Sequence, residues 1–232
     1  LSMEKGLPDG STPTRRCGGM RTDCLTTFSQ PNRLERLKGD NPSFKVSLME
    51  PGAKPVMSKA NLSGPKASIF ITCLVDQFRP AVGEAMVKVL ESHGVRLHFP
   101  QEQTCCGQPA FNNGYLAQAR KMAEHFIEVF DGDDYIVTPS GSCAAMVKKH
   151  YPSLFTHDPV LQERCRSVGA RVYEFSEFLV KVLGVEKAGN ASYPGRVTYH
   201  HSCHLLRELG IKEEPLRLLK SVQGLRYVEM EK

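Results

Sequence analysis

Residues 67–73 read ASIFITC, a run of apolar and β-branched residues that ends in a cysteine. This composition is typical of a buried β-strand. Residues 80–93 follow with the pattern of an amphipathic helix, which has a proline in its first turn and Gly94 as its stop. Residues 95–99 form a second strand-like run. A strand, a helix and a strand in this order predict parallel strands joined by a crossover helix.

The same alternation continues along the chain. Further helices are predicted over residues 116–130, 143–150, 176–183 and 214–222, and further strands over residues 135–138, 196–200 and 225–229. The sequence therefore predicts an α/β fold with an open, mainly parallel sheet and flanking helices.

Three segments of the chain differ in composition. Residues 1–56 are rich in Pro, Gly, Ser and Arg and show no helical or strand period, so we expect a disordered leader or upstream sequence there. Residues 57–190 are predicted to form a first α/β unit. Residues 191–232 start a second α/β unit, which we expect to be incomplete.

Charge and hydropathy patterns argue against several classes of protein. The net charge of +5 is spread along the chain without a basic run, which predicts no nucleic-acid partner. The longest apolar stretch, residues 67–75, is far shorter than the roughly 20 residues of a membrane span. No signal-peptide pattern is present at the N-terminus, so we expect a cytoplasmic protein, in which eight cysteines favour metal or redox chemistry over disulfides.

Four cysteines follow the first three predicted strands. Cys73 ends the first strand, Cys105 and Cys106 lie in the loop after the second, and Cys143 follows the third. Sites in open α/β sheets form beyond the carboxyl ends of the strands, so these four thiols are expected to meet at one edge. Four soft sulfur ligands on bendable loops suit a [4Fe–4S] cluster, with all four cysteines as its ligands.

Two other interpretations of these cysteines stay open. The thiolates could be purely structural ligands of zinc in an interaction module, although the usual pairs of cysteines two to four residues apart are absent. Cys105 and Cys106 could instead form a vicinal redox disulfide and carry out thiol–disulfide chemistry.

A possible second site lies in the run HHSCH, residues 200–204. Cys203, His201 and His204 could bind zinc or act as acid–base groups there, with His200 beside them and Arg207 as a weaker candidate for a substrate carboxylate. These side chains are equally compatible with an ordinary polar loop. The remaining sulfur residues are interpreted as incidental (Cys17 and Cys24) or as core residues (Cys165 and Met146).

Four runs of the sequence resemble the cysteine-rich CCG domain found in heterodisulfide reductases and in glycolate oxidase iron–sulfur subunits. They are FITCLVDQFRPAVGEAMVKVLE at 70–91, QTCCGQPAFNNGY at 103–115, TPSGSCAAMVKKHYP at 138–152 and YHHSCHLLRELG at 199–210. Within that family the runs are most similar to the lactate utilisation A group.

The resemblance implies an iron–sulfur subunit of a cytoplasmic system that oxidises L-lactate to pyruvate, together with sister iron–sulfur subunits. It also implies two similar CCG-type halves, of which the second is truncated and starts with Cys203 as its first ligand. Met146 stands where heterodisulfide reductase has a further cysteine, which favours a four-thiolate cluster. The chain has no flavin or nicotinamide signature, since no G-x-G-x-x-G loop is present.

Overall fold

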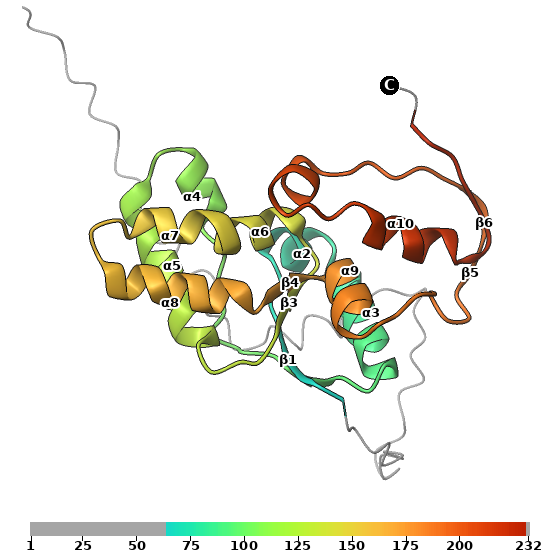
Figure 1. Ribbon diagram of the computed structural model, residues 1–232, viewed down its shortest axis with the longest axis horizontal. Helices are drawn as coiled ribbons and strands as arrows, with labels where there is room; N and C mark the ends of the chain where they lie inside the picture. The colour runs from blue at the N-terminus through green and yellow to red at the C-terminus, as the bar shows by residue number, and fades with distance from the viewer. Residues whose placement is uncertain (1–63, 231–232) are drawn as a thin grey trace, which may run out of the picture. The chain divides into compact units, whose positions relative to one another are not determined.

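The computed structural model describes residues 64–230, and within this part a four-stranded sheet forms the centre (Figure 1). Its strand order is β2-β1-β3-β4, and every neighbouring pair is parallel. The strands are β1 (Lys66–Ile69), β2 (Arg96–His98), β3 (Ile136–Thr138) and β4 (Val172–Glu174). The predicted parallel α/β sheet is therefore confirmed.

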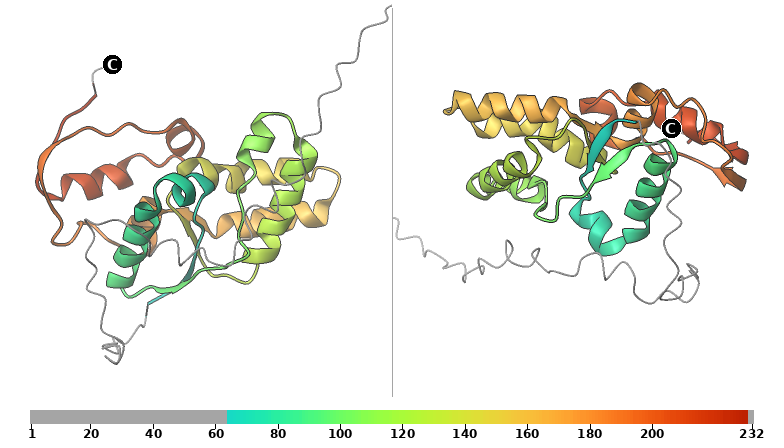
Figure 2. Two further views of the ribbon diagram at one scale, coloured as in Figure 1. Left: turned by 180° about the vertical axis from the view of Figure 1, so that it is seen from behind. Right: turned by 90° about the horizontal axis from the view of Figure 1, so that it is seen from below.

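Helices cover both faces of this sheet, as the views from the front and from behind agree (Figures 1 and 2). On one face Phe70 packs into an apolar cluster with residues of α5 (Leu116–Phe130), α7 (Tyr151–Leu154) and α8 (Pro159–Ala170). On the other face Ile69 packs with residues of α3 (Pro80–Ser92). Successive strand residues point to opposite faces, so β3 supplies both cores, with Ile136 in the first cluster and Val137 in the second.

Shorter elements complete the part of the chain before residue 190. They are α2 (Cys73–Phe78), α4 (Gln108–Asn112), α6 (Gly141–Ala145), the π-helical turn η2 (Met146–His150), α9 (Phe175–Glu177) and the π-helical turn η3 (Phe178–Val182).

The first strand is shorter than the sequence predicts. The apolar run indicates a strand as far as Cys73, but β1 ends at Ile69 and Cys73 already begins α2. Beyond Phe70, the backbone N–H of Ile71 donates to the side chain of Gln103 instead of to a neighbouring strand. A side-chain acceptor thus takes the place of the strand ladder and lets the chain turn into a helix.

The helix predicted over residues 143–150 also differs from the observed one in its start and its form. It begins earlier, at Gly141, because the Ser140 hydroxyl accepts a hydrogen bond from the Cys143 N–H and caps the helix. It then widens into η2 and continues as α7. Pro152 lies in α7 and cannot donate a backbone hydrogen bond, which favours a widened turn before it.

A second, two-stranded parallel sheet follows residue 190. It pairs β5 (Ser192–Val197) with β6 (Gln223–Tyr227), and the π-helical turn η4 (His204–Glu208) and α10 (Glu213–Lys220) lie between them in the chain. The bounds predicted for this strand, residues 196–200, are therefore wrong, because the observed strand begins at Ser192 and ends at Val197. Its pairing with β6 runs from Ser192, opposite Gln223, to Val197, opposite Tyr227.

Gly141 lies where η4 meets α6. A Cβ atom added there would lie 2.7 Å from Leu205 Cδ1 and 3.3 Å from Leu205 Cα. We therefore expect Gly141→Ala to lower the free energy of unfolding by about 2 kcal/mol, because a packed contact must open. Urea unfolding measures this change. Gly132→Ala is the matched control, since nothing lies within 4 Å of its added Cβ; equal effects of the two substitutions would contradict the prediction.

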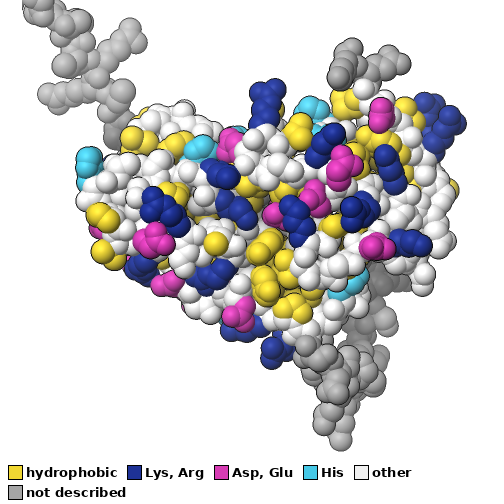
Figure 3. Space-filling model, in the orientation of Figure 1, with side chains coloured by type: hydrophobic (Ala, Val, Ile, Leu, Met, Phe, Trp, Pro, Cys, Tyr) yellow, Lys and Arg dark blue, Asp and Glu magenta, His cyan; other side chains and the backbone are white. Residues whose placement is uncertain are grey.

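The surface mixes residue types. On the face drawn in Figure 3, basic and acidic side chains are interspersed with apolar ones. Within residues 64–230, no helix combines the length and apolar character that crossing a bilayer requires. Residues 1–56, expected to be a leader, lie outside the described residues, as do Cys17 and Cys24.

Candidate functional site

Four cysteine side chains meet beyond the carboxyl ends of β1, β2 and β3. The Sγ atom of Cys73 lies 3.5 Å from the Sγ atom of Cys105. The Cys106 side chain hydrogen-bonds to those of both Cys105 and Cys143. Cys105, Cys106 and Cys143 are buried and Cys73 is partly exposed. The structure thus brings together the four cysteines that the sequence singled out.

The backbone at the vicinal pair turns through Gly107. Its φ is +81°, in the left-handed region that favours glycine. A Cβ atom there would also lie 3.2 Å from Met122 Cβ. Gly107 is the N-cap of α4, so the chain folds back immediately after presenting two sulfur atoms.

Gln103 holds two of the cysteine-bearing segments together. Its Oε1 accepts a 2.8 Å hydrogen bond from the Ile71 N–H, two residues before Cys73. Its Nε2 donates to the carbonyl oxygens of Ile69, at 3.1 Å, and Pro100, at 2.9 Å. Gln103 is only 1% exposed and lies two residues before Cys105. Sequence reasoning did not single it out, because a glutamine in a loop carries no pattern.

Two further polar side chains join the other loops. The buried Tyr151 hydroxyl donates to the Cys106 carbonyl oxygen at 2.9 Å. The Gln108 side chain donates to the Ser142 carbonyl oxygen at 3.3 Å and so links the vicinal-cysteine loop to the start of α6. These bonds fix the loops that carry the thiols, and neither residue was predicted from the sequence.

The four thiols divide into proton donors and acceptors. Hydrogen bonds from the Cys106 and Cys73 side chains lower the pKa of Cys105 to about 3, and the backbone N–H groups of Gly107 and Cys106 act in the same direction. A hydrogen bond from Cys106 also lowers the pKa of Cys143. The pKa of Cys73 is raised by its bond to Cys105, and that of Cys106 by its bonds to Cys105 and Cys143. Cys105 is therefore a thiolate at neutral pH.

A family model described as Cysteine-rich domain, CCG, matches residues 67–148 and 197–232. The first matched segment contains the four clustered cysteines, and the second contains Cys203. The chain belongs to the cysteine-rich CCG family. The resemblance predicted from the four sequence runs is thereby confirmed.

This CCG chain is similar to several proteins named Lactate utilization protein A. It is 52% identical over 165 residues to the one from Geobacillus thermodenitrificans (strain NG80-2), a match that covers 71% of this chain and 68% of that protein. The match to the one from Bacillus subtilis (strain 168) has the same coverage at 45% identity. Lactate utilization protein A 2 from Bacillus mycoides (strain KBAB4) is 50% identical over 160 residues, which cover 69% of this chain and 66% of that protein.

The cysteine cluster of the CCG chain has the donor chemistry that an iron–sulfur group requires. Such groups are bound by thiolates, and their charge is stabilised by hydrogen bonds to sulfur and by shielding from water. The backbone N–H of Leu74 hydrogen-bonds to the Cys73 sulfur, and those of Cys106 and Gly107 to the Cys105 sulfur. Four largely buried sulfur donors with N–H groups directed at them fit this chemistry.

The three residues of the possible second site of the CCG chain make separate contacts. Cys203 is exposed, and among residues 64–230 no hydrogen bond joins it to His201 or His204. The Nε2 atom of His201 lies 3.2 Å from the Lys212 carbonyl oxygen. His204 instead contacts Glu208, a residue that the sequence did not single out. Glu208 also contacts His150, which lies 58 positions away in the chain and was likewise not singled out from the sequence.

The two sulfur residues interpreted as core residues are buried in the CCG chain. Cys165, in α8, and Met146, in η2, are both 0% exposed and belong to the same apolar cluster as Phe70. Met146 therefore fills the core. All six cysteines in the described part of the chain are free thiols.

Proposed function

We propose that this chain is an iron–sulfur subunit of a cytoplasmic system that oxidises L-lactate to pyruvate. The proposal is supported by its CCG family and by relatives about half identical to it that are named Lactate utilization protein A. The observation that carries it is the meeting of Cys73, Cys105, Cys106 and Cys143 at one edge of the sheet. These four residues are proposed to hold a [4Fe–4S] cluster.

Each part of the site has a distinct task in this proposal. Cys105 supplies a ready thiolate, and Cys73, Cys106 and Cys143 supply the other sulfur ligands. Gln103 and Tyr151 hold the loops in position, while burial of the vicinal pair excludes water. A cluster bound there would accept and pass on one electron at a time.

The overall reaction constrains the partners. Conversion of L-lactate to pyruvate releases two electrons and two protons, and the chain carries no G-x-G-x-x-G loop for a nucleotide cofactor. We therefore propose that sister iron–sulfur subunits share the electron path with this chain.

The decisive experiment is anaerobic purification of the full chain, followed by iron, sulfide and zinc analysis. We expect about four iron and four sulfide per chain and a brown protein with visible charge-transfer absorption. A colourless protein with less than about one iron per chain would overturn the cluster assignment.

One distance favours a second candidate, a zinc-stabilised interaction module. Zinc–sulfur bonds of about 2.3 Å in a tetrahedron place neighbouring sulfur atoms about 3.8 Å apart. The 3.5 Å between the Sγ atoms of Cys73 and Cys105 is close to this spacing, although among the described residues no three of these sulfur atoms all lie within 4.8 Å of one another. The same experiment separates the two candidates, because zinc binding would give stoichiometric zinc, no visible absorption and no response to reductant.

A further inference from the structure

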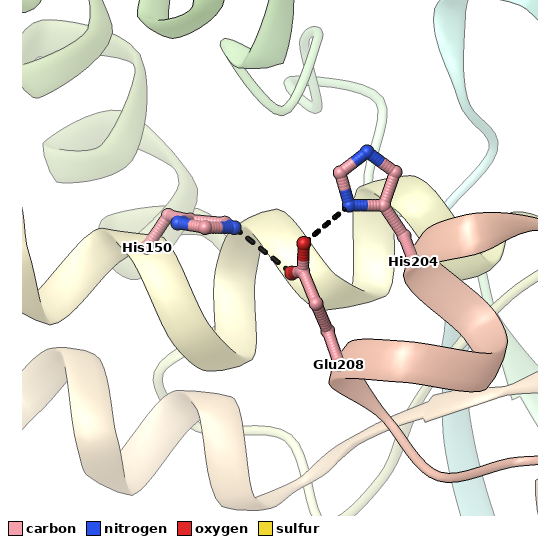
Figure 4. A group of neighbouring side chains, drawn as sticks. All are labelled: His150, His204 and Glu208. Atoms are coloured by element: carbon pink, nitrogen blue, oxygen red, sulfur yellow. Dashed lines mark hydrogen bonds and ion pairs between the residues drawn. The ribbon is translucent and has the colours of Figure 1, made fainter.

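A second group of side chains of the types that bind metals, His150, His204 and Glu208, lies where the C-terminal segment meets the first α/β unit. Figure 4 shows the Glu208 carboxylate between the imidazole rings of His150 and His204. The Nε2 atom of His150 lies 2.9 Å from Glu208 Oε2, and the Nδ1 atom of His204 lies 2.7 Å from Glu208 Oε1. One nitrogen from each ring and one carboxylate oxygen all lie within 4.8 Å of one another.

The backbone explains why these three side chains converge. His150 ends η2, in which the Tyr151 N–H reaches back to the Met146 carbonyl oxygen. His204 and Glu208 begin and end η4, in which the Leu209 N–H reaches back to the His204 carbonyl oxygen. All three residues are thus on widened π-helical turns, a feature that recurs at functional sites. The Phe111 ring packs against the His150 imidazole with centroids 5.1 Å apart and restricts its rotation.

The surroundings suit a bound cation with open coordination positions. The three side chains are 29% to 34% exposed, so they are partly held by the protein and partly open to solvent. Burial alone would raise the pKa of Glu208, but its hydrogen bonds to His204 and His150 outweigh burial and lower it. The carboxylate is therefore available as an oxygen donor between the two rings.

Two imidazoles and one carboxylate are a common ligand set for zinc and for iron(II). Ligand atoms about 2.1 Å from one tetrahedral ion are about 3.4 Å apart. The contacts of the two carboxylate oxygens with the rings are 2.7 and 2.9 Å, so each would lengthen by less than about 1 Å to admit an ion. The three donor atoms already lie within 4.8 Å of one another.

We propose that His150, His204 and Glu208 bind one divalent transition-metal ion, such as zinc, with at least one coordination position open to solvent. The ion joins His150, two residues after the end of the first family-matched segment, to the second matched segment. This site shares no ligand with the thiol cluster, since its donors are nitrogen and oxygen atoms alone. The proposal also does not depend on the proposed redox function.

The test measures zinc bound by the full chain after removal of loosely held metal. We expect the wild-type chain to bind one more zinc than His150→Ala and Glu208→Gln, while His157→Ala, which changes an exposed histidine elsewhere, retains that zinc. Iron content and the far-ultraviolet circular dichroism spectrum of each variant show that the thiol cluster and the fold are retained.

A second measurement needs no variant. Cobalt added to the wild-type chain should give the weak visible bands of nitrogen and oxygen coordination, in addition to any intense thiolate-to-cobalt absorption. Equal zinc binding by wild type, His150→Ala and Glu208→Gln would overturn the proposal. A cobalt spectrum with thiolate bands alone would overturn it as well, even if both variants failed to fold.

Discussion

Replacing Cys143 by serine should reduce the iron and sulfide of the purified chain from about four of each to less than one. The Cys143 side chain is buried and hydrogen-bonds to Cys106, which places it among the proposed ligands. A serine hydroxyl is a harder donor that stays protonated at neutral pH, which makes it a poor ligand for iron in a cluster. Iron and sulfide analysis, together with visible absorption, measures the loss.

Cys165→Ala is the matched control for this substitution. It also removes a buried thiol, but Cys165 lies in α8, and burial raises its pKa to about 11, so it is not a ready metal ligand. The control should keep the iron and the colour of the wild-type chain. If Cys143→Ser kept them as well, the ligand assignment would be wrong.

Replacing Gln103 by alanine should lower the free energy of unfolding by about 3 kcal/mol. The substitution leaves the Ile71 N–H without its acceptor and removes the donor that serves the carbonyl oxygens of Ile69 and Pro100. Each buried polar group left without a partner costs about 1 to 3 kcal/mol, although water entering the gap offsets part of the sum. Urea unfolding of the full chain provides the measurement.

Gln77→Ala provides the comparison for Gln103→Ala. Gln77 is exposed, and its side chain donates a hydrogen bond to the neighbouring Asp76. Because this bond joins adjacent residues, it does not hold distant segments together. Its loss should change the free energy of unfolding by less than about 0.5 kcal/mol. Should the two variants unfold at the same urea concentration, Gln103 would have no special role in joining the cysteine segments.

The four clustered cysteines could be located from the sequence because their positions follow from local patterns. Alternating strands and helices identify the loops beyond the strand ends, and parallel strands bring those loops to one edge. The strand β4, in contrast, was missed. Only Val172 of its three residues is fully buried, so the segment has neither the length nor the period that sequence reasoning detects.

Contacts between distant residues account for the parts of the site that were missed. Gln103 matters through bonds to Ile69 and Ile71, more than 30 positions away, and His150 through Glu208, 58 positions away. Neither contact leaves a local signal. The π-helical turns that aim His150, His204 and Glu208 likewise have no characteristic sequence period, so this group could be found only in three dimensions.

The low pKa of Cys105 affects how the cluster site would respond to acidity. A thiol must lose its proton before it binds a metal, so a site of four ordinary thiols releases four protons on loading. Cys105 has already lost its proton well below neutral pH. Loading therefore releases at most three protons, and metal affinity falls less steeply with acidification than it would for four independent thiols.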